Sequence, residues 1–445
     1  MVHLLRVQNA FLVLPLVLAA LAPAARGQTA SDPAPAPATD WTFHAQSTII
    51  EQGHASFPAE YTGPESLDNA AESARTFSLS LFLGRRLWSG AEVFYNPECF
   101  QGYGLSHTFG AAAFPNGEAV KSGFANLHYN TSRLFVRQVI GLGGEKEKIE
   151  EGPDQFADEV DVNRLVISVG KFSANDFFDD NAYSHDSRTQ FLNWALWESA
   201  AWDYPADIVG FTGGMVVEWN TSHGTLHYGL FMEPTEANGL RLDHHLSQAF
   251  GQILQYDFRY SLDGERNGTV RPFVYGNRAH MGLYSEADAE TNPDITTTRA
   301  YRWKEGAGIS WDQSLSANLG AFVRLSCDDG KTESFAFDEV DRSAAAGLSL
   351  KGTAWHRAED VVGLAGVVDG LAPDHRLYLA EGGTGLILGD GALHYGPEQA
   401  VEAYYSVRVG KWLTLSPDWQ YLERPGYNRD RGGVAIYAVR AHLEY

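Results

Sequence analysis

Long apolar runs are missing from the sequence after its first 27 residues. A transmembrane helix needs about 18 or more such residues, so none is expected in the rest of the chain. Cysteine is scarce as well: Cys99 and Cys327 stand far apart in 445 residues, and their spacing decides neither for a disulfide nor for two free thiols. Positive charge is in deficit, with 33 Lys and Arg against 56 Asp and Glu. The net charge of −23 argues against nucleic acid as a partner, because phosphate binding needs a basic surface.

Signatures of catalysis and of bound cofactors are also absent from the sequence. The glycines from Gly382 onward miss the GxGxxG spacing, and neither HExxH nor GxSxG occurs. We therefore predict no catalytic residue, no cofactor and no metal. Two alternatives stay open: Asp179 and Asp180 could form a glycosidase pair, and Asp176, Asp179 and Asp186 could bind calcium, although their spacing matches no EF-hand loop.

The N-terminal residues have the pattern of a secretory signal peptide. Arg6 precedes a short apolar run, Phe11 to Ala22, and small residues follow it. We expect a signal peptide at 1–27, a Pro/Ala-rich leader at 28–40 and one domain at 41–445. The mature chain is then exported, either as a soluble protein or as a β-barrel in the outer membrane.

Two-residue alternation of apolar and polar side chains recurs along the chain. In Arg75–Trp88 the residues Phe77, Leu79, Leu81 and Leu83 share one parity, and polar residues share the other. The same pattern returns in Gly224–Glu233 and Ser316–Cys327. It indicates strands with one apolar and one wet face. A soluble sandwich would alternate too, so the connections have to decide.

About sixteen candidate strands can be counted, and their connections alternate between long and short, with one long acidic exception at 142–162. The last candidate strand alternates up to the final residue, Tyr445. An even strand number with short turns at one end is typical of outer-membrane barrels. We therefore predict an all-β chain that forms a single antiparallel transmembrane barrel. The candidate strands are 41–50, 75–88, 91–97, 132–141, 163–172, 206–219, 224–233, 247–260, 269–278, 299–310, 316–327, 342–353, 360–369, 398–409, 413–422 and 433–445.

The stretch from Gly170 to Asp207 is too long and too aromatic for an ordinary connection. We predict that it folds into the barrel and constricts the pore. Its residues Trp194, Trp197 and Trp202 suggest a short helix with one aromatic face. That face could pack the loop against the wall or stack on a solute.

If the apolar parity faces outward, the polar parity lines the lumen. The wall is then expected to be locally basic, with much of the negative charge in loops such as Gly144–Asp161. Guanidinium and carboxylate groups can hydrogen-bond sugar hydroxyls, and indole rings offer flat faces to sugar rings. The alternative is that these charges only brace the wall and hold loops. The predicted pore-lining residues are Arg86, Glu92, Asn96, Arg133, Arg137, Trp194, Trp197, Arg302, Arg324, Glu402 and Arg408.

The chain resembles the carbohydrate-selective outer-membrane porins of the OprB type. The resemblance lies in FLGRRLWSGAEVFYNPE (82–98), GLSHTFGAAAFPNGEA (104–119), the long segment 170–207, DHRLYLAEGGTGLILGDGALHYGPE (374–398) and YNRDRGGVAIYAVRAHLEY (427–445). It implies a sixteen-stranded barrel in a Gram-negative outer membrane, loops folded into the pore, and passive diffusion of mono- and small oligosaccharides. The expected partners are sugars and outer-membrane lipid, with the chain a monomer or a homo-oligomer. The alternatives are a general or anion-selective porin and an outer-membrane or secreted carbohydrate-active enzyme.

Overall fold

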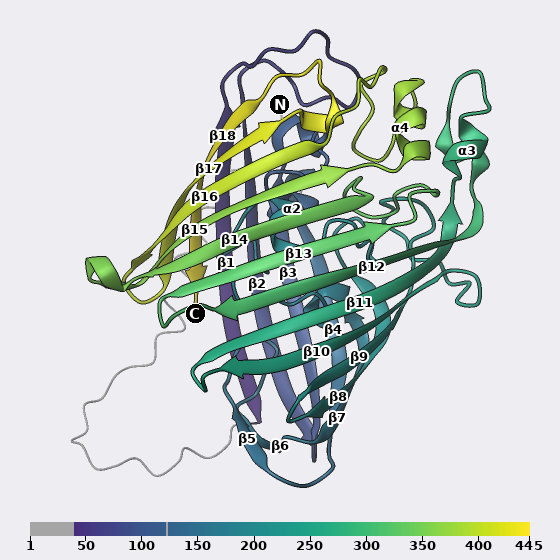
Figure 1. Cartoon of the computed structure of the whole chain (residues 1–445). Helices are drawn as coiled ribbons and strands as arrows, with labels where there is room; N and C mark the ends of the chain where they lie inside the picture. Colours follow the sequence, from purple (N-terminus) through teal and green to yellow (C-terminus); the bar gives the residue numbers. More distant parts are fainter. Residues whose placement is uncertain (1–39, 122) are drawn as a thin grey trace, which may run out of the picture. The chain divides into compact units, whose positions relative to one another are not determined.

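The computed structural model describes residues 40–121 and 123–445, so the expected signal peptide and nearly all of the leader lie outside the described residues. Sixteen strands form a closed barrel in which each strand pairs antiparallel with its neighbours (Figure 1). The predicted strand number and fold class are thereby confirmed. The barrel strands are β1 (Trp41–His54), β2 (Glu72–Trp88), β3 (Ala91–Gly102), β4 (Phe124–Gly141), β7 (Arg164–Phe172), β8 (Thr212–Thr221), β9 (Gly224–Phe231), β10 (Phe250–Leu262), β11 (Arg266–Met281), β12 (Ala300–Ser314), β13 (Leu319–Asp328), β14 (Arg342–Gly352), β15 (Arg357–Gly370), β16 (Glu398–Val409), β17 (Leu413–Glu423) and β18 (Val434–Glu444).

The connections contain a second, two-stranded sheet and short helices. The sheet pairs β5 (Lys146–Ile149) with β6 (Asp158–Asp161), and the α-helices are α2 (Trp194–Trp197), α3 (Tyr284–Ala287) and α4 (Pro373–Ala380). In Figure 1, α3 and α4 lie at the end of the barrel opposite to β5 and β6. We call these the loop end and the turn end. The 3₁₀ helices are η1 (Leu105–Thr108), η2 (Gly117–Lys121), η3 (Ala174–Asp176), η4 (Ile295–Thr298), η5 (Thr353–Trp355) and η6 (Pro425–Tyr427).

The first and last strands close the barrel. β1 pairs with β18 from Gln46 opposite Glu444 to His54 opposite Ile436. The final residue also takes part in this strand pairing, since the Tyr445 N–H donates to the Ala45 carbonyl of β1 at 2.8 Å. Closure leaves no strand edge unpaired, which is what a sheet in a hydrocarbon environment requires.

The predicted alternation, with apolar side chains outward and polar side chains inward, is confirmed in the strands from which it was predicted. In β18, Tyr437 and Val439 are 62% and 55% exposed, whereas Arg440 between Val439 and Ala441 is 1% exposed. In β13, Leu325 is 48% exposed and its neighbour Arg324 is 1% exposed. Apolar side chains therefore form the outer surface, and the polar parity faces an interior that loops largely fill.

Several strand boundaries differ from the prediction: β4, for example, begins at Phe124 and not at residue 132, and β3 extends to Gly102. The strand expected from residue 206 begins at Thr212, because the residues before it form a turn. The Asp207 carboxylate accepts the backbone N–H groups of Val209 at 3.1 Å and Phe211 at 3.0 Å. This side-chain bonding offers the backbone an alternative to the sheet ladder, so the connection between β7 and β8 runs from residue 173 to residue 211.

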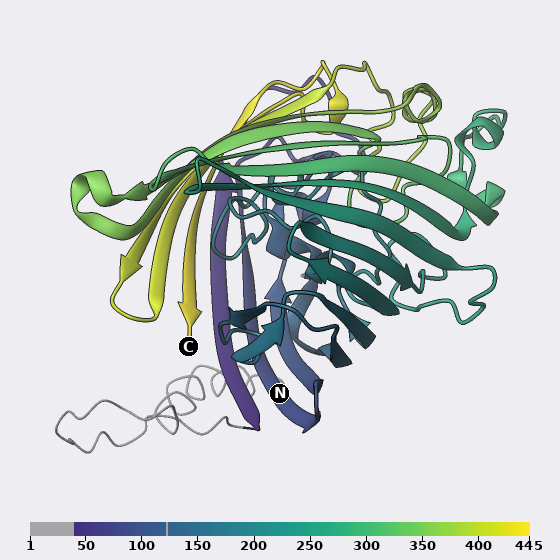
Figure 2. The same cartoon turned by 60° about the horizontal axis from the view of Figure 1, so that its bottom comes forward.

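The connection 173–211 is the interior core of the barrel. Its residues Phe178, Phe191, Trp194 and Leu196 are almost fully buried, and α2 lies inside the barrel wall in Figure 1. Figure 2 shows the strands curving around this interior. In the part of the chain that the structure describes, no helix is long and apolar enough to cross a membrane.

Candidate functional site: the lumen

Among the described residues, two large cavities lie against the inner face of the barrel wall. The loop-side cavity has a volume of about 420 Å³ and includes Trp197, Arg188 and Phe211 in its lining. The turn-side cavity has a volume of about 680 Å³ and includes the turn residues Ser89 and Gly90. Each is large enough for a small ligand. The two cavities share five lining residues, which we call the neck: Arg137, Gln155, Asp176, Phe177 and His185.

The neck combines charged, amide and aromatic groups. The Arg137 guanidinium lies 5.0 Å from the Phe94 ring centre, and its Nη1 donates to the Asp154 carbonyl at 2.7 Å. Phe177 packs edge-on against Phe172, with ring centres 5.0 Å apart. Such a set can donate to and accept from hydroxyl groups and offers a flat apolar face, which suits a polyhydroxylated ring.

Asp176 of the neck forms a charge pair with Arg133 of the wall. Arg133 Nε donates to Asp176 Oδ2 at 2.7 Å, and its Nη2 donates to Oδ1 at 2.5 Å. The Asp176 carboxylate also accepts the Ser173 N–H at 3.0 Å, which closes a capping box at η3. This bidentate geometry fixes both groups at the lumen wall. The predicted residues Arg133 and Arg137 therefore do line the cavities, as do Glu92 and Trp197.

Other predicted residues hold the long connection in place and line neither cavity. Arg324 binds the Asp179 carboxylate through Nε at 3.2 Å and the Leu196 carbonyl through Nη1 at 2.9 Å. Glu402 accepts the backbone N–H groups of Leu192 at 2.6 Å and Asn193 at 2.8 Å. For Arg324 and Glu402 the structure thus favours loop attachment over solute contact.

Arg188, which was not among the predicted residues, ties the same connection to the opposite wall. Its Nη2 donates to Glu98 at 2.5 Å, its Nε to Glu118 at 2.9 Å and its Nη1 to Ser80 Oγ at 3.1 Å. Burial alone would lower the pKa of Arg188, but the carboxylates of Glu118 and Glu98 raise it above its ordinary value. Arg188 therefore stays charged and holds the loop against β2 and β3.

The two predicted tryptophans have different surroundings. Trp194 is 2% exposed and packs against Phe114 and Phe337, with ring centres 5.0 and 5.2 Å away. It lines neither cavity and cannot stack on a solute in this structure. The ring centre of Trp197 lies 4.8 Å from that of Trp194, and Trp197 lines the loop-side cavity. The aromatic face of α2 thus belongs mainly to the loop's own core.

Four further predicted residues bind neighbouring segments. At the turn end, Arg86 pairs with Asp158 at 2.7 Å. In the middle of β3, opposite Arg133, Asn96 Nδ2 donates to Asp154 at 2.9 Å. Arg408 Nη1 donates to the hydroxyl of Thr414 at 3.3 Å. At the loop end, Arg302 Nη2 donates to Glu286 of α3 at 2.5 Å. None of these four lines either cavity; each binds a neighbouring segment.

The expectation of a locally basic wall is wrong for the turn-side cavity. Its lining carries only Arg137 and Arg164 as arginines. Eight carboxylates face them: Glu92, Asp158, Glu159, Asp161, Asp176, Asp180, Glu218 and Asp257. The physical reason is that the acidic segment, expected only as a loop that carries negative charge, folds against the inside of the barrel wall and supplies Asp158, Glu159 and Asp161 to this lining.

The residues that the sequence did not single out come from that segment and from the long connection. Asp154 and Gln155 lie in GPDQF, and His185 lies in a stretch of mixed polarity. Parity could not find them, because they are not on strands. For Phe177 the only signal was its position beside Asp176 in the aromatic segment.

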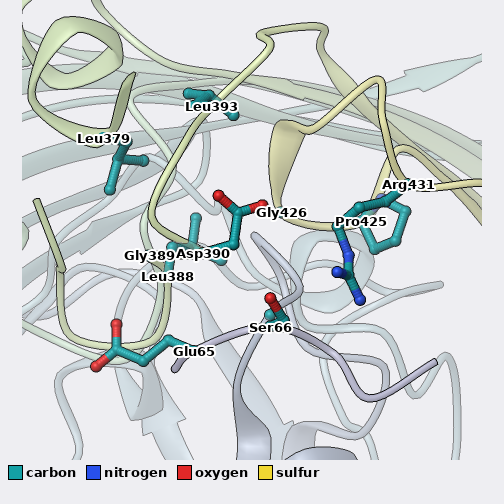
Figure 3. Close-up of a pocket in the computed structure, with 11 residues that line it drawn as sticks. Glu65, Ser66, Leu379, Leu388, Gly389, Asp390, Leu393, Pro425, Gly426 and Arg431 are labelled. Carbon is teal, nitrogen blue, oxygen red and sulfur yellow. The ribbon is translucent and has the colours of Figure 1, made fainter. Parts of the chain in front are cut away.

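The loop end is closely packed. A cavity of about 10 Å³ lies among four connections and is lined by Glu65, Asp390 and Arg431 (Figure 3). This is room for about one water molecule. Burial, reinforced by the Glu339 carboxylate, raises the pKa of Glu65 to about 8. This cavity is a seam between loops and is too small to pass a sugar.

A buried histidine joins three loop-end connections. His375 Nδ1 lies 3.1 Å from Asp341 Oδ2, and its Nε2 lies 3.4 Å from Glu339 Oε1 and 3.1 Å from the Tyr284 hydroxyl. Burial alone would lower its pKa, but the two carboxylates raise the pKa of His375 to about 9. The protonated ring therefore holds α4 and the neighbouring connections together.

The open alternatives for metal, disulfide and catalytic chemistry find no support in the geometry. Within residues 40–121 and 123–445, no group of three His, Cys, Asp or Glu side chains is placed to bind a metal ion. Cys99 and Cys327 are free thiols. Asp179 is fully buried and paired with Arg324, so it cannot act with Asp180 on a glycosidic bond.

Comparisons with known proteins agree with this architecture. The solved structure of Pseudomonas putida OprB at high pH is similar, with a TM-score of 0.67, 16% identity, and coverage of 91% of this chain and 94% of that one. Porin AaxA of Chlamydia caviae is 20% identical over 328 residues, 71% of this chain and 62% of that protein. Porin AaxA of Chlamydia abortus is 22% identical over 289 residues, 65% of this chain and 56% of that protein. The chain thus spans about three fifths of the length of these curated relatives.

A family model covers the barrel almost completely. The model of the carbohydrate-selective porin, OprB family, matches residues 64–445, which is all of the described chain except β1 and the residues next to it. Porins are channel proteins of the bacterial outer membrane, so the enzyme alternative falls away. The chain belongs to the OprB family of carbohydrate-selective porins.

Proposed function

We propose that this protein is a passive channel for neutral mono- and small oligosaccharides across the outer membrane. The observation that carries the proposal is the neck, where Phe177 offers an apolar face beside the Arg133–Asp176 pair and the Arg137 guanidinium. A sugar has ring C–H groups on its faces and hydroxyls at its edge, so it can use both kinds of group. The family match supports the same substrate class.

Anion selectivity is the less favoured alternative. The arginines beside the neck are already paired: Arg133 with Asp176, and Arg137 with the Asp154 carbonyl and, at 3.9 Å, with Glu92. The turn-side cavity is acid-rich. A permeating anion would meet repulsion that a neutral solute avoids, and a general porin would not need the aromatic face at the neck.

The outer wall suits lipid as the surrounding partner. Leu364, Val439 and Leu230 are among the exposed large apolar side chains of the strands, and they alternate with inward-facing residues. Such an apolar band is typical of barrels whose outer face contacts hydrocarbon.

Liposome swelling tests the proposal. Proteoliposomes that contain the purified protein should swell rapidly in glucose, more slowly in maltotriose, and more slowly in an uncharged polyethylene glycol than in a sugar of the same hydrodynamic size. Phe177→Ala should reduce the preference for sugar over polyethylene glycol. Phe258→Ala, a change on the exposed outer wall, is the matched control and should behave like the unchanged protein. Equal rates for sugar and size-matched polyethylene glycol would refute sugar selectivity.

A further inference from the structure

The connection between β4 and β7, residues 142–163, differs from the other connections at the turn end. It carries the β5–β6 hairpin, whereas β2 and β3 are joined only by residues 89 and 90. Figure 1 places β5 and β6 at the turn end, and Figure 2, which brings that end forward, shows them in front of the barrel interior. The turn-side cavity includes Ile149 and Asp158 of this segment together with Glu218 of β8. The segment therefore lies over the lumen.

Contacts with several wall strands fix the segment in this position. Thr42 of β1 donates to Glu151 at 2.6 Å, and Arg164 of β7 donates to Glu147 at 2.6 Å. Arg86 of β2 pairs with Asp158. In the barrel β1 and β2 are neighbours and β7 follows them after β3 and β4, so these bonds fasten the hairpin along one arc of the wall, while the cavity that it lines reaches Glu218 of β8 and Asp257 of β10.

The tip of the segment, residues 153–156, enters the lumen. Phe156 is 3% exposed, packs 5.8 Å from Phe94 and lies under the Arg86 guanidinium at 4.7 Å. Asp154 has a left-handed backbone conformation with a φ of 52°, and Asn96 binds its carboxylate at 2.9 Å. A buried phenyl ring on one side and a bonded carboxylate on the other hold the tip in one orientation.

Gln155 lies at the neck itself. It lines both cavities, and Asp154 lines the loop-side cavity. Asp176, Phe177 and His185 reach the same place from the loop end. The junction of the two cavities is thus formed by two segments that enter from opposite ends of the barrel, with Arg137 of the wall between them.

We propose that the tip 153–156 is a second constriction element of this channel and that Asp154 and Gln155 are specificity-determining residues. Gln155 restricts the width of the neck from the turn end. The Asp154 carboxylate lies 3.9 Å from Arg133, so together with Asp176 it offsets the positive charge beside the neck. The consequence is a channel that passes neutral sugars in preference to anionic ones. This selectivity rests on the proposed sugar transport, whereas the narrowing of the lumen does not.

Two single substitutions test the element in opposite directions in planar bilayers. Gln155→Trp should lower the single-channel conductance in KCl several-fold, because an indole replaces an amide at the neck. Gln399→Trp, at an exposed position of β16, is the control and should leave conductance unchanged. Asp154→Asn keeps an oxygen and a similar shape but removes a charge. It should raise the flux of a hexuronate relative to glucose several-fold and shift the reversal potential toward chloride.

Replacement of residues 146–161 by a short turn tests the whole segment. Conductance should rise several-fold and maltotriose should pass faster, while heat-modifiability on a gel shows whether the barrel is assembled. If the replacement does not assemble, the two single substitutions decide. Unchanged conductance in Gln155→Trp, or an unchanged hexuronate-to-glucose ratio in Asp154→Asn, would overturn the role of the tip. If the unchanged protein passes no sugar but Gln155→Trp still lowers conductance, the sugar proposal fails and the constriction stands.

Discussion

Arg324→Met is the substitution that probes how the long connection is held inside the barrel. Arg324 is 1% exposed, and it donates to the Asp179 carboxylate, the Asp179 carbonyl at 3.0 Å and the Leu196 carbonyl at 2.9 Å. Methionine has a comparable stem but no donor. The Asp179 carboxylate, fully buried in the native protein, would be left with the Ser199 N–H and hydroxyl and the neighbouring Glu198 carboxyl as its remaining partners.

The expected cost follows from this geometry. Breaking a buried ion pair by removing one partner costs about 3–5 kcal/mol, since it leaves an uncompensated charge. At about 1.4 kcal/mol per factor of ten, the equilibrium between docked and released loop shifts roughly a hundredfold to a few thousandfold. The barrel itself should remain assembled, because the ladder uses only the backbone of residue 324, opposite Ser310 and Ala345, which the substitution keeps, and a released Asp179 regains water.

Single-channel recording measures the released state directly. Arg324→Met should show higher mean conductance and frequent transitions between levels, with normal heat-modifiability on a gel. The double variant Arg324→Met with Asp179→Asn should recover much of the native conductance, with few transitions between levels. The reason is that neither member of the former charge pair then leaves a buried charge unpaired. If Arg324→Met shows no more transitions between conductance levels than the unchanged protein, the connection is held mainly by its apolar packing and the reasoning from the charge pair is wrong.

Three further outcomes are expected from the outer wall, the lumen and the loop end. Val439→Arg, at an outward position near the middle of β18, should cost about 2–4 kcal/mol in urea unfolding from lipid bilayers, whereas Glu218→Arg in the turn-side cavity should fold and change conductance, and equal losses would refute the parity. His375 has a pKa raised to about 9, so its stabilisation is complete below about pH 6.5 and is lost as the pH rises through 9. Proteolysis of the loop end should therefore increase between pH 7 and pH 10 in the native protein, and His375→Gln should be cut readily and equally at both pH values. A tag inserted at Glu290 should be labelled on intact cells and one at His223 should not, with the opposite result reversing the orientation of the barrel.

The barrel could be predicted from the sequence because its signal is local. Alternation places Leu79 on one face and Ser80 on the other without knowledge of any distant contact, and a closed sheet repeats this rule in every strand. The final strand was visible for the same reason, with Val439 and Tyr445 sharing one parity. Strand ends were less visible, as at Asp207, where a side chain and not the strand pattern ends the ladder.

The lumen could be predicted only in part, because parity gives the direction of a side chain but not its partner. Arg137 and Arg324 both face inward, yet one lines the cavities and the other is covered by the long connection. Arg408 faces a turn instead. Which of these occurs depends on where the connections fold, and nothing in the alternation of a strand encodes that.

The acidic segment is the clearest case of this limit. Its sequence indicated only a long acidic connection, with no partner for Asp158 or Glu147. The structure pairs them with Arg86 and Arg164, which the wall presents at the turn end. Only the combination of wall charges with segment charges would have indicated that the segment folds over the lumen.

The most direct test of sugar transport through this neck is the block of ion current by sugar in a planar bilayer. Glucose and maltotriose added to one side should reduce single-channel KCl current in a concentration-dependent, saturable manner, and an uncharged polyethylene glycol of similar size should reduce it less. Phe177→Ala should weaken the sugar block while leaving the channel open. A current that falls equally for sugar and polyethylene glycol, or a block that Phe177→Ala leaves unchanged, would contradict a sugar-binding neck in this channel.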